Sequence, residues 1–179
     1  MAKKKSELYE WVKTIIIALL IAFTVRTFIF TPIVVDGASM EPTLQEENRM
    51  IVNKIGEPKR FDIIVFHAPD GRQYIKRVIG LPGDKIEYKD DVLYINGKAY
   101  KEPYLEKFKK KIGDGHLTGS FTLKETAVGA DTVPKGHLFV LGDNRMDSKD
   151  SRGIGAIPME KVIGTTKLVF YPEIKIIKN

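Results

Sequence analysis

The sequence predicts a mainly β protein in which a single N-terminal transmembrane helix precedes an antiparallel β-sheet or barrel-like extracytoplasmic domain. Two observations lead to this prediction. The stretch from 14 to 35 is almost uncharged and long enough to cross a bilayer, whereas the apolar segments after residue 36 are short and separated by turn signals. We therefore divide the chain into residues 1–35, a short cytoplasmic N-terminus with the anchor, and residues 36–179, the extracytoplasmic domain.

The anchor contains one charged residue, Arg26. At 1.5 Å per residue, even residues 14–31 cover about 27 Å, close to the roughly 30 Å of a hydrocarbon core. A buried core helix is disfavoured because the stretch has no polar face. A cleavable signal peptide has a shorter apolar region that ends at small residues, whereas Pro32 and bulky residues follow here. We therefore expect an uncleaved anchor, with Arg26 at the outer interface.

The charges that flank the anchor predict its orientation. Four lysines precede it, namely Lys3, Lys4, Lys5 and Lys13, and no basic residue follows it before Arg49. Short cytoplasmic flanks are enriched in basic residues, so the N-terminus is expected in the cytoplasm. The predicted localisation is the cytoplasmic membrane, crossed once, with phospholipid as a partner and residues from about 36 onward outside.

Composition excludes several function classes. The chain has no cysteine, so it has no disulfide, no thiolate metal site and no cysteine nucleophile. Its three histidines, at 67, 116 and 137, lack the helical spacing of a zinc site, and we expect no metal. The net charge of +6 divides evenly between residues 1–35 and 36–179, which is too weak a bias for a nucleic-acid binder.

The domain after the anchor is predicted to consist of short strands. Its β-branched and aromatic segments are 50–52, 63–66, 74–75, 78–79, 92–95, 138–141 and 167–171. Asn96-Gly97 between two of these segments predicts a type I′ hairpin. Residues 101–132 are polar and rich in glycine, which indicates a loop or hairpin extension. Its cluster of lysines is also compatible with a contact to anionic lipid or envelope polymer.

Ser39 is a candidate nucleophile because small residues surround it. Gly37 and Ala38 leave space around the hydroxyl, and Pro42 restricts the turn that follows. Nucleophilic catalysis also needs a base next to the hydroxyl. The local pattern alone is equally compatible with a small-residue linker that leaves the membrane.

The segment 74–79 offers a candidate base. In a strand, Lys76 and Arg77 point to opposite faces, so in a sheet covered on both sides one cation is drawn inside. A desolvated lysine loses affinity for its proton and becomes a general base, which arginine cannot do. Lys76 is therefore the candidate base and Arg77 a fixed ion-pair partner. A solvent-facing lysine beside an arginine at the rim fits this strand equally well.

A third segment, 142–155, combines charges of both signs with Gly and Asn. This composition is typical of a loop cross-linked by hydrogen bonds and ion pairs. It lacks the spacing of a calcium-binding loop. It is compatible with a structural loop or with one that supports a site.

Together, four segments resemble type I signal peptidase in its shorter Gram-positive form, the membrane-bound serine protease that removes signal peptides from exported proteins. After the anchor, these segments are 37–44 (GASMEPTL), 60–66 (RFDIIVF), 74–84 (YIKRVIGLPGD) and 142–155. The family's fold is a coil of antiparallel sheets on the outer membrane surface. By this resemblance Ser39 is the nucleophile and Lys76 the general base of a Ser/Lys dyad, and Ser148 holds the lysine amine. The resemblance also implies that the site is braced by Asp143, Asp150, Arg77 and Arg152.

The resemblance further implies the substrate and the reaction. An extended segment of a precursor protein adds as a strand beside the site, with small side chains at −3 and −1 in shallow apolar pockets. Cleavage passes through an acyl-enzyme and needs no cofactor. Met40, Tyr74 and Ile75 are adjacent to the dyad and are the candidates for pocket lining.

Two departures from the family pattern stand out. Phe61 occupies a position where the family usually has glycine, before the aspartate of that segment. Gly37 occupies a position where some members have a serine that helps to stabilise the oxyanion, which leaves the Ser39 backbone N–H as a donor.

Two other functions are compatible with parts of the pattern. A self-cleaving transcriptional repressor shares a Ser/Lys dyad on a related β-fold, but it should have a helix-turn-helix domain, and this chain has a membrane span instead. A non-catalytic β-module displayed on the cell envelope, or an inactive signal-peptidase paralogue, is the third hypothesis. The presence of both Ser39 and Lys76 argues against it.

Overall fold

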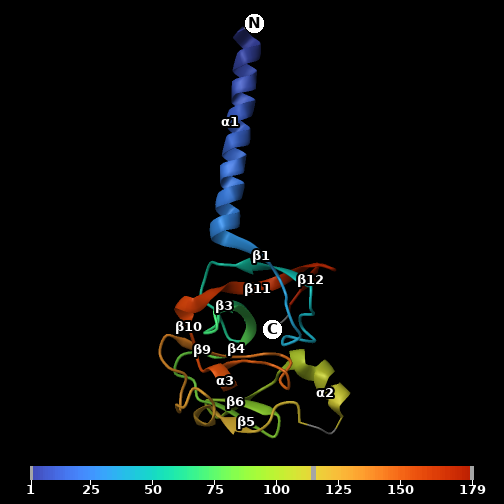
Figure 1. Ribbon diagram of the computed structural model, residues 1–179, viewed down its shortest axis with the longest axis vertical. Helices are drawn as coiled ribbons and strands as arrows, with labels where there is room; N and C mark the ends of the chain where they lie inside the picture. The colour runs from blue at the N-terminus through green and yellow to red at the C-terminus, as the bar shows by residue number, and fades with distance from the viewer. Residues whose placement is uncertain (1, 114–115, 178–179) are drawn as a thin grey trace.

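The computed structural model describes residues 2–113 and 116–177 and consists of a long helix followed by a β domain (Figure 1). Helix α1 (Ala2–Thr24) continues into the π-helical segment η1 (Val25–Ile29). The stretch Glu7–Ile29 is long and apolar enough to cross a membrane. The helix ends at Ile29, within the segment 1–35 assigned to the N-terminus and anchor. Pro32 cannot continue a helix, and it lies instead in the first strand.

The β domain consists of two antiparallel sheets, which confirms the predicted fold class. The larger sheet has the order β1-β2-β11-β3-β4-β9-β10, and β12 pairs with β11. Its strands are β1 (Phe30–Val34), β2 (Arg49–Asn53), β3 (Ile63–His67), β4 (Gln73–Gly80), β9 (His137–Leu141), β10 (Ile157–Pro158), β11 (Val162–Tyr171) and β12 (Lys175–Ile176). The smaller sheet has the order β7-β6-β5-β8. Its strands are β5 (Ile86–Lys89), β6 (Val92–Ile95), β7 (Lys98–Tyr100) and β8 (Phe121–Thr122).

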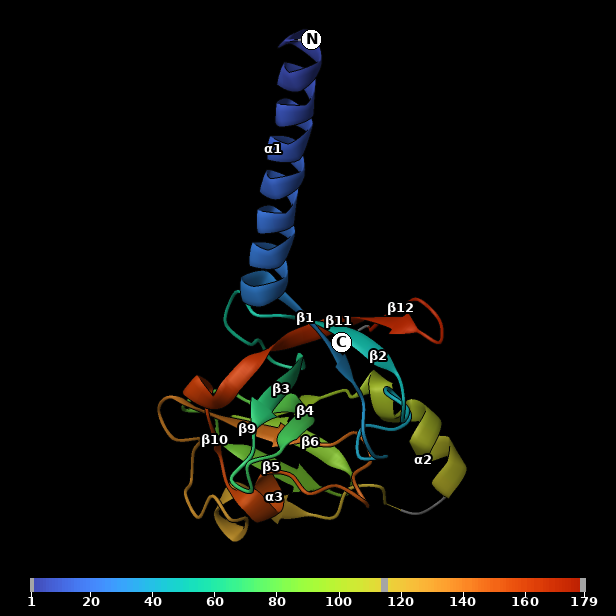
Figure 2. The same cartoon turned by 45° about the horizontal axis from the view of Figure 1, so that its top comes forward.

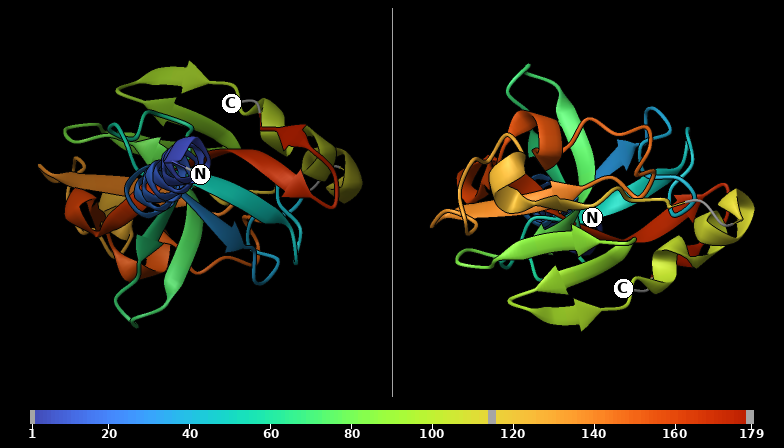
Figure 3. Two further views of the ribbon diagram at one scale, coloured as in Figure 1. Left: turned by 90° about the horizontal axis from the view of Figure 1, so that it is seen from above. Right: turned by 90° about the horizontal axis from the view of Figure 1, so that it is seen from below.

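The two sheets lie at different distances from the helix. Figure 1 and Figure 2 show α1 projecting from one end of the domain, with β1, β11 and β12 next to its base and β5 and β6 at the far end. Seen along the helix axis in Figure 3, the strands fan out around that base.

The predicted hairpin between β6 and β7 is confirmed. Asn96 has φ 53° and Gly97 has φ 78°, the two positive values that a type I′ turn requires. Residues 101–132 carry more structure than a simple loop. They contain η2 (Pro103–Leu105), α2 (Glu106–Ile112), β8 and η3 (Leu123–Glu125), while residues 114 and 115 lie outside the described part of the chain. Helix α2 was not expected, because seven residues are too few to show a helical apolar period.

Strand β3 is covered on both faces, and its neighbour β4, which carries Lys76 and Arg77, is buried beside it. Ile63 and Val65 pack into one apolar cluster, and Ile64 and Phe66 pack into another. Strand β4 pairs with β3 over residues 73–77, and its residues from Lys76 onward are buried. Two short helical segments follow β9, namely α3 (Ser151–Ile154) and η4 (Met159–Lys161).

Candidate active site

Ser39 lies in a turn between β1 and β2, and apolar packing holds this turn in place. The next residue, Met40, is 1% exposed, and Leu44 is fully buried in the same cluster as Val65. Backbone hydrogen bonds from Glu41 N to Ala38 O (3.1 Å) and from Leu44 N to Met40 O (3.0 Å) close the turn. The backbone at Ser39 is therefore fixed from below, while its half-buried hydroxyl faces a groove.

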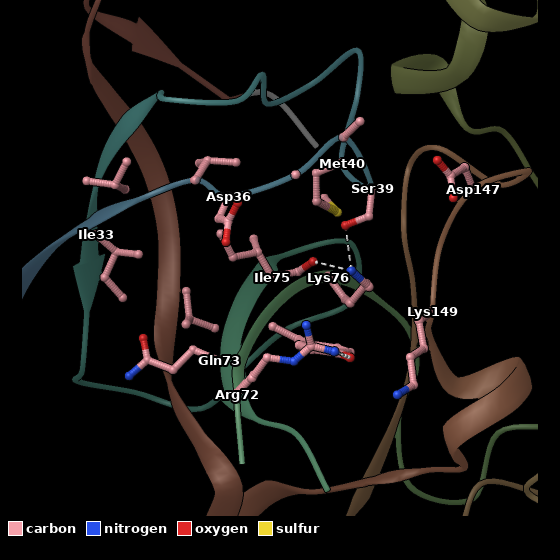
Figure 4. Close-up of a pocket in the computed structure, with 16 residues that line it drawn as sticks. Ile33, Asp36, Ser39, Met40, Arg72, Gln73, Ile75, Lys76, Asp147 and Lys149 are labelled. Carbon is pink, nitrogen blue, oxygen red and sulfur yellow. Dashed lines mark hydrogen bonds between the residues drawn. The ribbon is translucent and has the colours of Figure 1, made fainter. Parts of the chain in front are cut away.

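The Lys76 amine meets the Ser39 hydroxyl. Lys76 Nζ donates hydrogen bonds to Ser39 Oγ (2.7 Å) and to the carbonyl oxygen of Ile75 (3.0 Å), as Figure 4 shows. Ser39 and Lys76 come from a turn and from β4, respectively, and are brought together by the fold. The distance between the two atoms is that of a nucleophile and its general base.

The surroundings of Lys76 favour the neutral amine. The residue is 4% exposed, and in the described part of the chain no carboxylate lies within ion-pair distance of it. Burial lowers the pKa of Lys76 from 10.5 to about 8, although Asp150 and Asp143 oppose this effect through space. A lysine with such a pKa has a substantial neutral fraction under mildly alkaline conditions.

Arg77 points to the other face of β4 and has the opposite environment. Its guanidinium is fully buried and donates to both carboxylate oxygens of Asp143, at 2.8 and 2.6 Å. Its Cζ lies 3.8 Å from the centre of the Tyr104 ring. Burial alone would lower the pKa of Arg77, but the hydrogen bonds and charge of Asp143 outweigh it, so the pKa is raised. Arg77 is thus a permanent cation in a closed ion pair.

The unusual residue Phe61 contributes to this ion pair through its backbone. Its φ is 67°, a left-handed conformation that favours glycine and that a bulky side chain rarely adopts. The Phe61 carbonyl accepts a hydrogen bond from Arg77 Nη1 (2.9 Å). The turn is therefore formed despite the bulky side chain.

The loop from Gly142 to Gly155 lies against the dyad, and Asp150 organises it. The Asp150 carboxylate accepts hydrogen bonds from the Gly142 N–H (3.0 Å) and from Arg152 Nε and Nη2, and it caps α3. Gly142 has no room for a side chain, because a Cβ there would lie 2.5 Å from the Ser39 carbonyl oxygen and would collide with the Ser148 hydroxyl. Gly142 thus allows the loop to approach both serines.

Ser148 is close to the site but does not contact the amine. Its hydroxyl is buried over Gly142 and has no hydrogen-bond partner among the described residues. The expected hydrogen bond from Ser148 to Lys76 is absent, since Lys76 Nζ bonds to Ser39 and Ile75. An orienting role for Ser148 stays a prediction.

A groove of about 560 Å³ runs up to the Ser39 hydroxyl (Figure 4). Ile33 to Met40 line one wall and Arg72 to Lys76 the other, and Asp147 and Lys149 also line the groove. All three residues expected to line a pocket, Met40, Tyr74 and Ile75, do line it. Strand β1 is the edge of its sheet, and β9 pairs with β4 only from Arg77 onward. Within the described chain, both walls therefore have an unpaired strand edge.

Comparison with known proteins agrees with this geometry. Residues 8–171 match the family described as "Signal peptidase, peptidase S26". The chain belongs to this family. It is 48% identical over 174 residues to signal peptidase I of Bacillus caldolyticus, an alignment that covers 95% of this chain and 93% of the relative. It is 49% identical over 181 residues to signal peptidase I T of Bacillus subtilis, covering 96% and 90% of the two chains.

A solved structure is also similar. The crystal structure of a signal peptidase I from Enterococcus faecalis V583 has a TM-score of 0.60 and 46% identity, and it covers 62% of this chain and 97% of that chain. The resemblance found from the sequence is therefore confirmed, and signal peptidase is the enzyme class of this chain.

Sequence reasoning missed two residues that hold the signal peptidase site together. The Thr43 hydroxyl donates a hydrogen bond to Asp143, which ties the Ser39 turn to the buried ion pair. Asn144 N donates to the Ser39 carbonyl (3.1 Å), and Asn144 Nδ2 donates to the Ala38 carbonyl (3.3 Å). Both lie inside recognised segments, but hydrogen bonds across the fold leave no signal in one sequence.

A second buried ion pair fixes the loop from behind. Arg145 is 2% exposed, and its guanidinium pairs with Glu102 and donates to Tyr88 Oη (2.8 Å) and to the Gly142 carbonyl (3.0 Å). Thr118 accepts a further hydrogen bond from it. The polar segment 101–132, expected to be a loop or extension, thus supplies two groups that hold the Gly142–Gly155 loop.

Proposed function

We propose that the chain is a membrane-bound serine endopeptidase that cleaves N-terminal signal peptides from exported precursor proteins after small residues at −3 and −1. Ser39 is the nucleophile and Lys76 the general base. The observation that carries this proposal is the 2.7 Å contact between Ser39 Oγ and a buried lysine that has no ion-pair partner among the described residues. Signal-peptide cleavage is the activity of the family, and the proposal adds the residues and the course of the reaction.

The reaction begins with neutral Lys76. As Ser39 Oγ attacks the scissile carbonyl carbon, its proton passes to Lys76 Nζ, and a tetrahedral oxyanion forms. The Ser39 N–H donates to no acceptor in the described chain, so it is available to this oxyanion. The Lys76 ammonium then protonates the leaving amine, and the acyl-enzyme remains. Neutral Lys76 next activates a water molecule, which releases the signal peptide and restores Ser39.

The groove supports a substrate that binds as a strand. The open edges of β1 and β4 offer backbone hydrogen bonds to an extended segment. Side chains of a bound strand alternate, so those at −1 and −3 point to the same wall. Met40 and Ile75 are apolar residues next to the dyad, one from each side of the groove, and we assign the shallow pockets for small side chains to the space that they border.

The anchor supports a catalytic domain held outside the cytoplasm. The four lysines before the span favour a cytoplasmic N-terminus, and residues 36–179 then form the extracytoplasmic catalytic domain. Precursors emerging across the same membrane would meet the groove on that side. Ser148, Asp143, Asp150, Arg77 and Arg152 support the dyad in this proposal, and no metal or cofactor takes part.

The test is cleavage of a purified precursor with an Ala-X-Ala site by the full-length protein in detergent. We expect cleavage after the second alanine by the wild type, and background activity for Ser39→Ala, because the covalent route is lost. Ser120→Ala removes an exposed serine outside the groove and is the matched control. Cleavage by Ser39→Ala, or no cleavage by the wild type, would reject the proposal and favour a non-catalytic module.

A further inference from the structure

A second pocket lies where the helix joins the domain, and the peptidase mechanism does not use it. It has a volume of about 370 Å³ and is formed by the end of α1, by η1, by the start of β1 and by the residue after β2. Six residues line it, namely Phe23, Arg26, Thr27, Thr31, Pro32 and Lys54. The lining thus combines two cations, two hydroxyl groups and two apolar side chains, and contains no carboxylate.

Lys54 is held at this pocket by the helix end. Its backbone N–H donates to the Ile29 carbonyl (2.9 Å), and its Nζ donates to the Thr27 carbonyl (2.8 Å). Both acceptors belong to the last turn before β1, where carbonyl groups have no partner within a helix. Neither hydrogen bond neutralises the charge of the ammonium group. In the described chain, Arg26 and Lys54 have no carboxylate within ion-pair distance.

The pocket lies at the end of the membrane-spanning helix, the level at which the head groups of a bilayer are expected. The membrane-spanning helix ends at Ile29, and Arg26 lies in its last turn, at the end next to the β domain. Exposed apolar side chains surround this level, including Phe28 (67% exposed), Phe30 (42%) and Ile55 (60%). Side chains of this kind contact acyl chains, whereas the two cations lie where lipid phosphates lie.

We propose that this pocket binds the phosphodiester group of one anionic phospholipid, with an acyl chain along Phe23. Two unpaired cations favour a lipid with net negative charge over a zwitterionic one, whose own ammonium group they would repel. The lipid bridges the helix and the end of β2. Because β1 starts in the pocket and leads to the Ser39 turn, the bound lipid fixes the height of the groove above the bilayer. This inference rests on the membrane anchoring in the proposed function.

The test counts lipids bound to the full-length protein. Native mass spectrometry from detergent micelles, with phosphatidylglycerol or phosphatidylcholine added, should show one retained phosphatidylglycerol and a clear preference over phosphatidylcholine. In the double variant Arg26→Gln/Lys54→Gln the affinity for phosphatidylglycerol should fall about 30-fold, because two basic contacts are lost. The variant Arg26→Lys/Lys54→Arg keeps both cations and should retain the lipid.

Two further arms sharpen the result. Lys13→Gln/Lys59→Gln removes the same charge outside the pocket and should leave retention unchanged. Inorganic phosphate at millimolar concentration should not displace the lipid, and displacement would show that the site recognises free phosphate and would overturn the proposal. Equal retention of both lipids, unchanged retention after Arg26→Gln/Lys54→Gln, or loss in Arg26→Lys/Lys54→Arg would also overturn it. Because lipid counting does not depend on cleavage, an inactive enzyme would still report on this site.

Discussion

Lys76 and Arg77 are consecutive residues of β4, both almost fully buried, and their surroundings differ in one decisive way. Arg77 has a bidentate carboxylate partner, Asp143, and its pKa is raised. Lys76 has a hydroxyl and a carbonyl as partners, so burial lowers its pKa to about 8. A strand that is covered on both sides can thus hold a fixed cation on one face and a potential base on the other. What separates the two roles is the partner, since both cations are buried.

The largest effect is expected from Lys76→Arg. A guanidinium keeps the charge but cannot release its proton at accessible pH, so the variant should be as inactive as Ser39→Ala. The measurement is kcat/KM with a peptide that contains the cleavage site. Lys89→Arg, at an exposed strand end, is the matched control and should be fully active. An active Lys76→Arg enzyme would show that the base is elsewhere.

Gly142→Ala changes the loop on the Lys76 side of β4 and should reduce kcat/KM nearly as much as Lys76→Arg does. The added methyl group would collide with the Ser148 hydroxyl and lie 2.5 Å from the Ser39 carbonyl oxygen, so the loop and the nucleophile must separate. Displacement of reacting groups by about 1 Å costs about 10²-fold or more in rate. Gly153→Ala in the same loop meets no atom within 4 Å and should keep its activity in the same assay. Equal rates for the two variants would contradict this packing.

Ser148→Ala should reduce kcat by about 10²-fold, less than Ser39→Ala does. The Ser148 hydroxyl has no hydrogen-bond partner in the described resting enzyme, so in this account it orients the Lys76 amine only after the amine has taken the Ser39 proton. Its removal leaves the nucleophile in place, and one such preorganising contact is typically worth about 10²-fold. Single-turnover rates of the two folded variants provide the comparison. Background activity in both Ser148→Ala and Ser39→Ala would contradict the assignment of Ser39 as the nucleophile and Ser148 as an orienting residue.

Asp143→Asn should affect stability more than chemistry, because it acts on the Arg77 face. It leaves a buried guanidinium without its counter-charge, a change that costs about 3–5 kcal/mol. Thermal unfolding should therefore occur at a clearly lower temperature, while the folded enzyme loses less activity than Ser148→Ala does. Because Asp143 also raises the pKa of Lys76, its removal should move the acidic limb of the pH profile to lower pH. A large loss of kcat at unchanged stability would show that Asp143 acts in catalysis, and would contradict the separation of a structural Arg77 face from a catalytic Lys76 face.

The sequence predicts the parts of this molecule that depend on local pattern. The apolar stretch, the alternating short strands and the Asn96-Gly97 turn carry their own signals, because span length and turn dihedrals follow from adjacent residues. The opposite orientation of Lys76 and Arg77 also follows from the two-residue period of a strand. That both are buried could not be deduced, since burial depends on what the rest of the chain packs against them.

The remaining features arise from contacts between distant segments. Glu102 lies in a segment expected to be a polar loop, and Arg145 lies in one expected to be cross-linked by ion pairs. That the two form a buried pair, which holds the Gly142 carbonyl, follows only from the fold. Phe61 occupies a left-handed turn that its residue type disfavours, and the ion pair of Arg77 stabilises that turn. Ser39 and Lys76 were paired by resemblance, because no local pattern joins a turn to a strand 37 positions away.

The pH dependence of kcat/KM tests most directly whether Lys76 is a base made available by burial. The neutral form exists above the pKa, so activity should rise with pH through an acidic limb near pH 8 and should fall about tenfold for each unit below it. A substrate without titratable groups and the wild-type enzyme suffice for this measurement between pH 6 and 10. A limb near 6.5, the ordinary value of histidine, would point to His67, His116 or His137 as the base and would contradict the assignment of Lys76.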